Sequence, residues 1–460
     1  MLDAKKLEID NLIEKQRKYF YTEETKKLSF RKEQLKKLYS LIRNNQETIL
    51  EALKKDLGKS YREGYLSEVS MCLMEITHML KHLNKYAKRI RVKNNISTMF
   101  SKSYLYKEPL GVNYIIAPFN YPFQLAIIPL IDSMAAGNTN ILRLSDKSKF
   151  TKEVITKLLN ENFDEKYIKV LDLTHEESNY LTSNKIDHVF FTGSTGVGKN
   201  IMKLASENLT KVSLELGGKS PCIVLKDCNL KDAARKIVFG KFLNVGQTCV
   251  AADHILVEKS FKDELISAIK EELNHAFGAE PIKNEFYGKI IDKHAFDRLV
   301  SYLNDGTIVH GGKYDDQTLK IEPTILVDIK DGSKLDTDEI FGPILPIYTF
   351  EKEEEIFTFE KNYNHPLAFY IFTKNTKLAE KVLNKFSFGG GCLNDCLAHM
   401  INDNLPFGGI NYSGLNNYHG EYGFNTFSHL KPILKSGNIS IKLRFPPYDD
   451  DIELASKLLK

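Results

Sequence analysis

Four polar side chains lie far apart in this sequence, each inside a short motif, and the first three along the chain could do covalent chemistry on a carbonyl group. They are Asn120 in Ala-Pro-Phe-Asn-Tyr-Pro, Glu215 in Leu-Glu-Leu-Gly-Gly-Lys-Ser-Pro, Cys249 in Gly-Gln-Thr-Cys and Glu339 in Glu-Ile-Phe-Gly-Pro. A thiolate attacks a carbonyl carbon, a carboxylate can activate water, and an amide N–H can stabilise an oxyanion. These are the parts needed to oxidise an aldehyde through a covalent thioester.

The three candidate catalytic residues also have ordinary structural interpretations. A lone cysteine is often a core residue, and a glutamate is usually a surface or capping carboxylate. The turn before Cys249 nevertheless suits the presentation of a thiol, and the largely apolar neighbours of Glu215 favour a buried base with a raised pKa. Asn120 lies between Pro118 and Pro122, and its local sequence fits a simple turn as well as an oxyanion donor.

A glycine-rich segment follows a predicted strand at 188–191 and opens a predicted helix at 199–209. Backbone N–H groups at such a junction can bind a pyrophosphate. The spacing G-x-x-G-x-G departs from the standard dinucleotide fingerprint, and it nearly matches the phosphate loop of nucleotide triphosphatases. However, Asn200 stands where that loop needs a hydroxyl, which argues against an ATPase. The candidate cofactor-binding residues of this segment are Gly193, Ser194, Thr195, Gly196, Val197 and Gly198.

Taken together, these motifs resemble the aldehyde dehydrogenase superfamily, from the N-terminal helices to Phe427-Ser428-His429. The C-terminal wording is similar to the class 3 branch, notably Leu-Pro-Phe-Gly-Gly at 405–409, Tyr-His-Gly at 418–420 and Pro-Pro-Tyr at 446–448. The resemblance implies that Cys249 is the nucleophile and that the Asn120 amide and the Cys249 N–H hold the oxyanion. It also implies that Glu215 activates water to hydrolyse the thioester, which separates this interpretation from relatives that pass the acyl group to coenzyme A.

The same resemblance assigns further residues to NAD or NADP. Glu339 would hold the nicotinamide ribose and Phe341 would pack against the ring, although a Gly-Pro turn is nearly as good a local interpretation. Arg143 and Asp146 stand where relatives carry Lys and Glu beside the adenosine ribose. Asp146 could accept from a ribose hydroxyl and repel a 2′-phosphate, whereas Arg143 could pair with that phosphate, so the choice of cofactor stays open.

The elements that must position these residues alternate between short apolar runs and amphipathic segments. Strands are predicted at 112–117, 139–144, 167–171, 188–191 and 221–225, and helices at 32–57, 66–87 and 151–160. A second series follows Cys249, with runs at 254–257, 261–276, 324–326, 344–348 and 368–372. This alternation predicts an α/β fold with parallel sheets.

The resemblance implies a division into three parts. A Rossmann-like cofactor domain takes 1–90 and 109–214, and a catalytic α/β domain takes 215–430. A small β arm at 91–108 and 431–446 would bridge two copies in a homodimer.

Composition bounds the function classes. The chain has 460 residues, a formal net charge of +4 and 42 % hydrophobic residues, which suits a globular protein and predicts no nucleic-acid partner. Six scattered cysteines indicate a reducing compartment, so we expect a cytoplasmic protein. We expect no signal peptide, because the first twenty residues are charged and contain no apolar core segment, and no membrane anchor, because residues 449–460 form no hydrophobic tail. The most apolar stretch, 125–136, is too short to span a bilayer and contains Asp132.

The remaining expectations concern ligands. No metal site is expected, since Cys392 and Cys396 lack the further ligands that zinc needs. The substrate would be a medium- or long-chain aliphatic or an aromatic aldehyde. A non-enzymatic structural role is the other alternative, although all the catalytic residue types are present.

Overall fold

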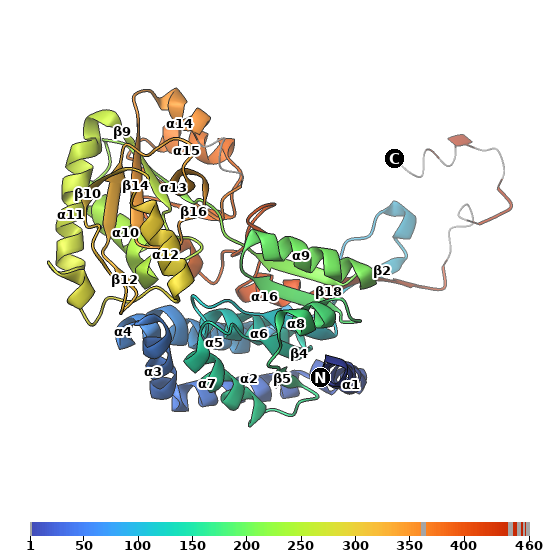
Figure 1. The fold of residues 1–460 in the computed structure, drawn as a ribbon. Helices are drawn as coiled ribbons and strands as arrows, with labels where there is room; N and C mark the ends of the chain where they lie inside the picture. Colours follow the sequence, from blue (N-terminus) through green and yellow to red (C-terminus); the bar gives the residue numbers. More distant parts are fainter. Residues whose placement is uncertain (1, 360–364, 440–444, 449–451, 454–455, 457–460) are drawn as a thin grey trace.

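The computed structural model describes residues 2–359, 365–439, 445–448, 452–453 and 456. Two large sheets, each covered by helices, lie beside one another, and a small sheet that contains β2 (Ser101–Pro109) and β18 (Ser428–Ser436) projects on the side away from the second large sheet (Figure 1). The predicted α/β architecture is confirmed. Part of the expected arm, 440–444, lies outside the described residues.

The first sheet has six strands and is parallel except at one edge. In spatial order its strands are β17 (Gly414–Leu415), β7 (Lys211–Glu215), β6 (His188–Thr192), β3 (Val112–Ile116), β4 (Thr139–Arg143) and β5 (Ile168–Val170). Only β17 runs antiparallel, against β7. All five residues of β3 are buried, as expected for a central strand of a parallel sheet that is covered on both faces.

The two faces of this sheet pack against different helices. On β3, Ile115 packs on one side in a cluster with residues of α6 (Gln124–Ala136), while Tyr114 packs on the other with residues of α1 (Leu2–Tyr21). Every residue of α6 is buried, which is typical of a helix that is apolar on all sides. The strand alternation thus fixes which side chains face each layer.

The second sheet has seven strands. Their spatial order is β10 (Thr307–His310), β13 (Thr324–Val327), β14 (Ile344–Phe350), β9 (His254–Glu258), β8 (Pro221–Val224), β15 (Ala368–Phe372) and β16 (Gly390–Leu393). It is parallel apart from β10, and a two-stranded ribbon of β11 (Tyr314–Asp315) and β12 (Lys320–Ile321) accompanies it. In Figure 1 it lies at the upper left with α10 (Leu230–Phe242) and α11 (Lys262–Phe277).

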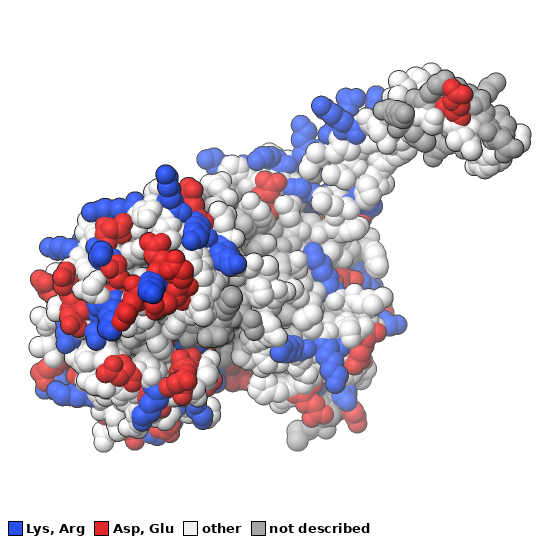
Figure 2. Space-filling view, turned by 90° about the horizontal axis from the view of Figure 1, so that it is seen from above, with Lys and Arg blue, Asp and Glu red and all other residues white. Residues whose placement is uncertain are grey.

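The projecting sheet is antiparallel and consists of β1 (Ile90–Val92), β2 (Ser101–Pro109) and β18 (Ser428–Ser436). Its longest pairing joins all nine residues of β18 to β2. Two segments at opposite ends of the chain therefore form one arm, and Figure 2 shows it extending away from the body. On the face drawn there, cationic and anionic side chains are interspersed, without a continuous basic stripe.

The other helices complete the two covered sheets. They are α2 (Leu28–Asn44), α3 (Gln46–Leu57), α4 (Tyr61–Gly64), α5 (Ser70–Tyr86), α7 (Lys149–Asn160), α8 (His175–Thr182), α9 (Thr195–Ala205), α12 (Lys293–Tyr302), α13 (Lys334–Thr337), α14 (Glu353–Phe359), α15 (Thr376–Lys385) and α16 (Gly420–Thr426). Among the described residues, no helix combines the length and apolarity needed to cross a bilayer.

Two helices differ from the sequence predictions. The helix predicted at 32–57 is two helices, because the chain breaks at Asn45, whose side chain donates to the Leu41 carbonyl. The helix predicted at 199–209 begins earlier, at Thr195, so part of the glycine-rich segment is itself helical. The range 215–430 contributes to both large sheets, since β17 pairs with β7 and α16 packs on α6.

Candidate active site

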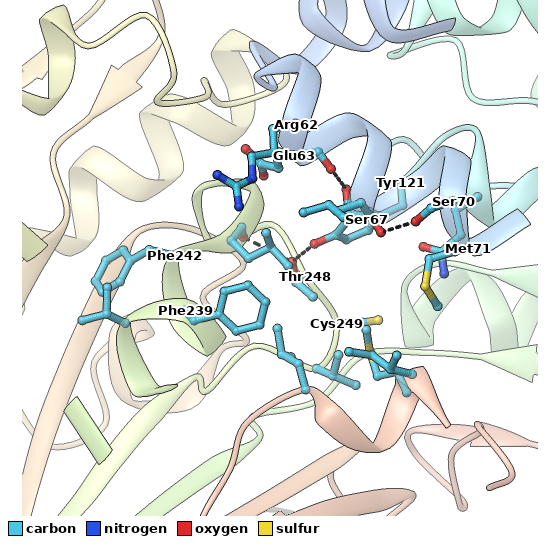
Figure 3. A pocket seen from close by; sticks show the side chains of 18 of the residues that line it. Arg62, Glu63, Ser67, Ser70, Met71, Tyr121, Phe239, Phe242, Thr248 and Cys249 are labelled. Carbon is cyan, nitrogen blue, oxygen red and sulfur yellow. Dashed lines mark hydrogen bonds between the residues drawn. The ribbon is translucent and has the colours of Figure 1, made fainter. Parts of the chain in front are cut away.

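A cavity of about 790 Å³ lies between the two covered sheets and contains Cys249 in its wall (Figure 3). Its surface is mainly apolar. The apolar lining includes Leu66, Met71, Met74, Val238, Phe239, Phe242, Phe277, Leu397, Met400, Ile401, Phe407 and Tyr418. A mainly apolar cavity that also has polar groups in its wall is the usual form of a small-molecule site.

Cys249 follows a short turn with an unusual backbone. Three consecutive residues, Asn244, Val245 and Gly246, have φ values of 52°, 56° and 75°, in the left-handed region. A β-branched residue such as Val245 rarely adopts this conformation, so the turn stores strain next to the thiol. A Cβ atom at Gly246 would lie 2.3 Å from the Gly342 carbonyl oxygen, and only glycine fits there. The turn explains why the Gly-Gln-Thr-Cys motif begins with glycine.

Asn120 is brought to the nucleophile turn by a direct hydrogen bond. Its Nδ2 donates to the Gln247 carbonyl across 3.0 Å, two residues before Cys249, and its side chain is buried. The adjacent Tyr121 hydroxyl lies 2.6 Å from Thr248 Oγ1. Because an amide nitrogen carries two hydrogens, one remains for an oxyanion. The structure therefore places this residue beside the thiol segment, where a donor can act.

Glu215 ends β7 and is 3 % exposed. No hydrogen-bond partner is found for its Oε2 within the described part of the chain. Burial raises the pKa of this carboxyl well above its usual value. A buried carboxyl with one free oxygen can take a proton from water, which is the role that the sequence predicted.

Glu339 lies against the backbone that follows Glu215. Its carboxylate accepts from the Gly218 N–H, and a Cβ at Gly217 would lie only 2.0 Å from Glu339 Oε2. Burial, and then the charge of Asp253, raise the pKa of Glu339 to about 8. Gly217 thus leaves room for the Glu339 side chain.

The thiol of Cys249 is kept neutral by its surroundings. Burial raises its pKa to about 12, and the charges of Glu339 and Glu215 add to the effect. Because only the thiolate attacks carbonyl carbon, the proton must pass to a nearby base as the reaction begins. Glu339 and Glu215 are the carboxylates whose charges act on the Cys249 thiol.

Phe341 lies close to the loop that carries Asn120. Its φ is 50°, a strained value for an aromatic residue, and its ring contacts Phe119 edge-to-face with centroids 5.9 Å apart. The Gly342 carbonyl that faces Gly246 follows directly. The structure thus brings the 339–342 segment to the nucleophile turn.

The glycine-rich segment has features that suit a bound pyrophosphate. Ser194 is the N-cap of α9 but makes no side-chain capping bond, so the first N–H groups of the helix lack a side-chain partner of that kind. A Cβ at Gly196 would meet no atom within 4 Å, whereas one at Gly198 would lie 2.7 Å from Leu216 Cδ2. Gly198 therefore allows close packing, and Gly196 leaves open space at the helix start. Thr195 donates to the Tyr412 carbonyl, and Val197 is 48 % exposed.

The expected adenosine side contains a cation that the sequence motifs did not indicate. Arg143 Nη2 lies 3.4 Å from Asp146 Oδ2, and its Nε donates to the Leu173 carbonyl. Lys152, from α7, lies 2.5 Å from Asp146 Oδ1 and 2.6 Å from Asp172 Oδ1. Lys152 does not lie in a recognisable sequence motif, and only the fold places it near the end of β4. Asp146 therefore faces two cations.

The cysteine pair considered for zinc does not gather ligands. Cys392 Sγ lies 3.5 Å from His399 Nδ1. Across the described ranges, no group of three or more His, Cys, Asp or Glu side chains is arranged to hold a metal ion.

Comparison with known proteins agrees with this geometry. The model of the aldehyde dehydrogenase family matches residues 1–433. The 4,4'-diaponeurosporen-aldehyde dehydrogenase of Staphylococcus aureus is 45 % identical over 94 % of this chain and 94 % of its own length. Aldehyde dehydrogenase family 3 member A2 of Rattus norvegicus is 40 % identical over 95 % of this chain and 91 % of its own length, which confirms the class 3-like resemblance.

A solved structure extends the likeness to three dimensions. The substrate-bound state of Staphylococcus aureus AldH superimposes with a TM-score of 0.96 at 43 % identity, over 98 % of this chain and 99 % of that one. The family match over nearly the whole length, together with the Asn120 amide and the Glu215 carboxyl that lie near the Cys249 segment, leads to one assignment. This chain belongs to the aldehyde dehydrogenase family, and it is an oxidoreductase that uses NAD or NADP.

Proposed function

We propose that this protein oxidises long, apolar aldehydes to carboxylic acids through a thioester on Cys249. The observation that carries the proposal is the mainly apolar cavity of about 790 Å³ that has Cys249 in its wall. Burying each methylene of a substrate chain is favourable by about 0.8 kcal/mol, so a long chain would gain much of its affinity there. The Staphylococcus aureus relative is named for 4,4'-diaponeurosporen-aldehyde, which supports a long substrate.

Each residue has a role in the proposed mechanism. The Cys249 thiolate attacks the aldehyde carbon, and the Asn120 amide and the Cys249 N–H stabilise the oxyanion. NAD or NADP, when bound, accepts a hydride. Glu215 then takes a proton from water, and the resulting hydroxide attacks the thioester carbon. The carbon–sulfur bond breaks, the acid leaves, and Cys249 regains its proton.

The cofactor would bind along the carboxyl ends of the first sheet. The residues proposed to hold it are Gly193, Ser194, Thr195, Gly196, Val197, Gly198, Arg143, Asp146, Glu339 and Phe341. The open space at Gly196 and the Asp146 carboxylate between two cations support this placement. The arrangement of Asp146 between two cations is compatible with both NAD and NADP, since the carboxylate suits a ribose hydroxyl and the cations suit a phosphate.

The first test is reduction of NAD⁺ or NADP⁺ followed at the reduced-nicotinamide absorbance band, with aldehydes of increasing chain length. We expect kcat/KM to rise with chain length and coenzyme A to be unnecessary. The Cys249→Ala variant should show no turnover. Reduction that requires coenzyme A, or a preference for the shortest aldehydes, would contradict the proposal.

We also propose that the protein forms a homodimer through the projecting arm. Leu430, Ile433 and Leu434 of β18 are 50 %, 40 % and 43 % exposed, and β18 forms an edge of its sheet. Exposed apolar edge strands are usually covered by a partner. Sedimentation velocity should give a dimer that Leu434→Glu dissociates. Six free cysteines, one of them the proposed nucleophile, support a cytoplasmic location.

A further inference from the structure

A buried ion pair lies behind the loop that carries Asn120. The Lys59 ammonium is 2.5 Å from Glu68 Oε1, and both side chains are fully shielded from solvent. Burying two charges is costly unless each makes further hydrogen bonds, and replacing such pairs by apolar residues is often neutral for stability. The pair therefore calls for a role besides stability.

The Lys59 ammonium makes three contacts. Besides Glu68, its Nζ donates to the Asn120 carbonyl across 3.1 Å and lies 3.9 Å from the centroid of the Tyr121 ring. An ammonium has three hydrogens, and these three contacts account for them. Two of the three contacts fall on the proposed oxyanion residue and its neighbour.

Glu68 fixes the other end of the same loop. Its Oε2 accepts the N–H groups of Phe123 and Gln124 across 2.8 and 3.2 Å, at the start of α6. Phe123, the N-cap of α6, has no side chain able to cap the helix, so Glu68 supplies the missing acceptor from a distance. Glu68 itself lies in a π-helical turn, Tyr65–Val69, a feature that is frequent at functional sites.

The Asn120 loop is thus held from two sides. Lys59 and Glu68 hold its backbone from behind, while Asn244 Nδ2 donates to the Asn120 carbonyl across 2.7 Å from the nucleophile turn. The Asn120 side chain then reaches the Gln247 carbonyl. A shift of the backbone at residue 120 would move the amide away from the oxyanion.

From these contacts we infer that Lys59 and Glu68 are positioning residues, which act on aldehyde oxidation through the placement of the Asn120 amide. The inference rests on the proposed function of Asn120. Neither residue touches the reacting atoms. A misplacement of about 1 Å in such a site can cost about a hundredfold in rate, which sets the scale of the effect.

The test is a double-mutant cycle measured as kcat/KM for a long-chain aldehyde at saturating cofactor. We expect Glu68→Gln to lower kcat/KM at least tenfold in the wild-type background and less than twofold when Asn120 is already replaced by alanine. Cofactor affinity should be unchanged in both backgrounds. A structural defect alone would lower activity by the same factor in both, and that result would overturn the inference.

A second variant is needed if Glu68→Gln leaves the Lys59 charge buried without a counterion and the protein does not fold. The double variant Lys59→Met/Glu68→Gln removes both charges, while the side-chain oxygen of the introduced glutamine still accepts from α6. The double variant also breaks the hydrogen bond from Lys59 to the Asn120 carbonyl. We therefore expect its loss of kcat/KM to be large with Asn120 present and small in the Asn120→Ala background. Equal losses with and without the Asn120 amide would again overturn the inference.

Asp56 offers a matched control. It caps α7 from α3 in the same manner, accepting from the Phe150 and Thr151 N–H groups across 3.1 and 2.7 Å. Asp56→Asn should lower the melting temperature but change kcat/KM less than twofold. A wild-type protein that reduces neither NAD⁺ nor NADP⁺ would overturn the proposed function and the inference together. An active wild type with a tenfold loss in Asp56→Asn would overturn only the inference.

Discussion

The main-chain N–H of Gly193 donates to the main-chain carbonyl of Glu215 across 2.9 Å. This bond joins the start of the glycine-rich segment to the proposed general base. It continues the parallel ladder of β6 and β7, in which Thr192 pairs with Glu215. One sheet register therefore sets the relative position of the proposed cofactor loop and the proposed base, and a change in either segment is expected to affect both.

Replacement of the base should separate the two halves of the reaction. In Glu215→Gln, the thioester still forms but hydrolyses slowly, so stopped-flow absorbance should show a burst of reduced cofactor followed by turnover about 10² to 10⁴ times slower. Burial raises the Glu215 pKa, so the wild-type base is protonated at low pH and kcat should rise as pH increases through that raised pKa. This limb should vanish in the Gln variant. Wild-type steady-state turnover in Glu215→Gln would rule out the assignment.

The charge on Glu339 should control the reactivity of Cys249. The Glu339 pKa is about 8, so its charge is present mainly above that pH, where it holds the thiol pKa higher. Glu339→Gln should therefore speed iodoacetamide modification of Cys249 by about threefold to tenfold at pH 9, and by little at pH 6.5. Peptide mass spectrometry follows the site, and the half-buried Cys392 serves as the internal control. An equal change at Cys392 would point to general loosening of the protein.

Asp146 should set the preference between the two cofactors. Its carboxylate neutralises Arg143 and Lys152, which lie 3.4 and 2.5 Å away. Asp146→Ala removes the carboxylate that pairs with Arg143 and that shares Lys152 with Asp172, and it removes an acceptor for a ribose hydroxyl, so the ratio of kcat/KM for NADP⁺ over NAD⁺ should rise at least tenfold. Adding Lys152→Met to that variant should reverse most of the gain. An unchanged ratio in both variants would place the adenosine ribose elsewhere.

The sequence indicated the parts of the site that lie within local motifs. Cys249, Glu215 and Asn120 each stand in a short segment, and the buried strands of the sheets are continuous apolar runs, so the α/β fold and these candidates could be predicted. The contributions of Lys59 and Glu68 could not. Neither lies in a motif, and the hydrogen bonds from Lys59 to Asn120 and from Phe123 to Glu68 span 61 and 55 positions of the chain.

Other features escaped prediction because they depend on tertiary contacts. The left-handed backbone at Val245 is rare for a β-branched residue, and the groups that contact this turn, Gly342 and Asn120, are distant in the chain. The pairing of β17 with β7 joins Gly414 to Glu215 across most of the catalytic range. A strand of two residues is too short to show the periodicity from which strands are predicted.

Gly196 should show opposite effects on stability and on cofactor binding. It lies in the first turn of α9, and a Cβ there would meet no atom within 4 Å, so Gly196→Ala should stabilise the fold by about 0.4 to 1 kcal/mol. If the pyrophosphate approaches this backbone, the added methyl occupies its space, and the cofactor Kd should rise about tenfold. Gly246→Ala is the contrasting change, because its Cβ would lie 2.3 Å from the Gly342 carbonyl at a φ of 75°, and it should lower the melting temperature. Thermal unfolding and calorimetric titration with NAD⁺ measure the two effects. A Gly196→Ala protein with a higher melting temperature and unchanged Kd would remove this glycine from the cofactor site.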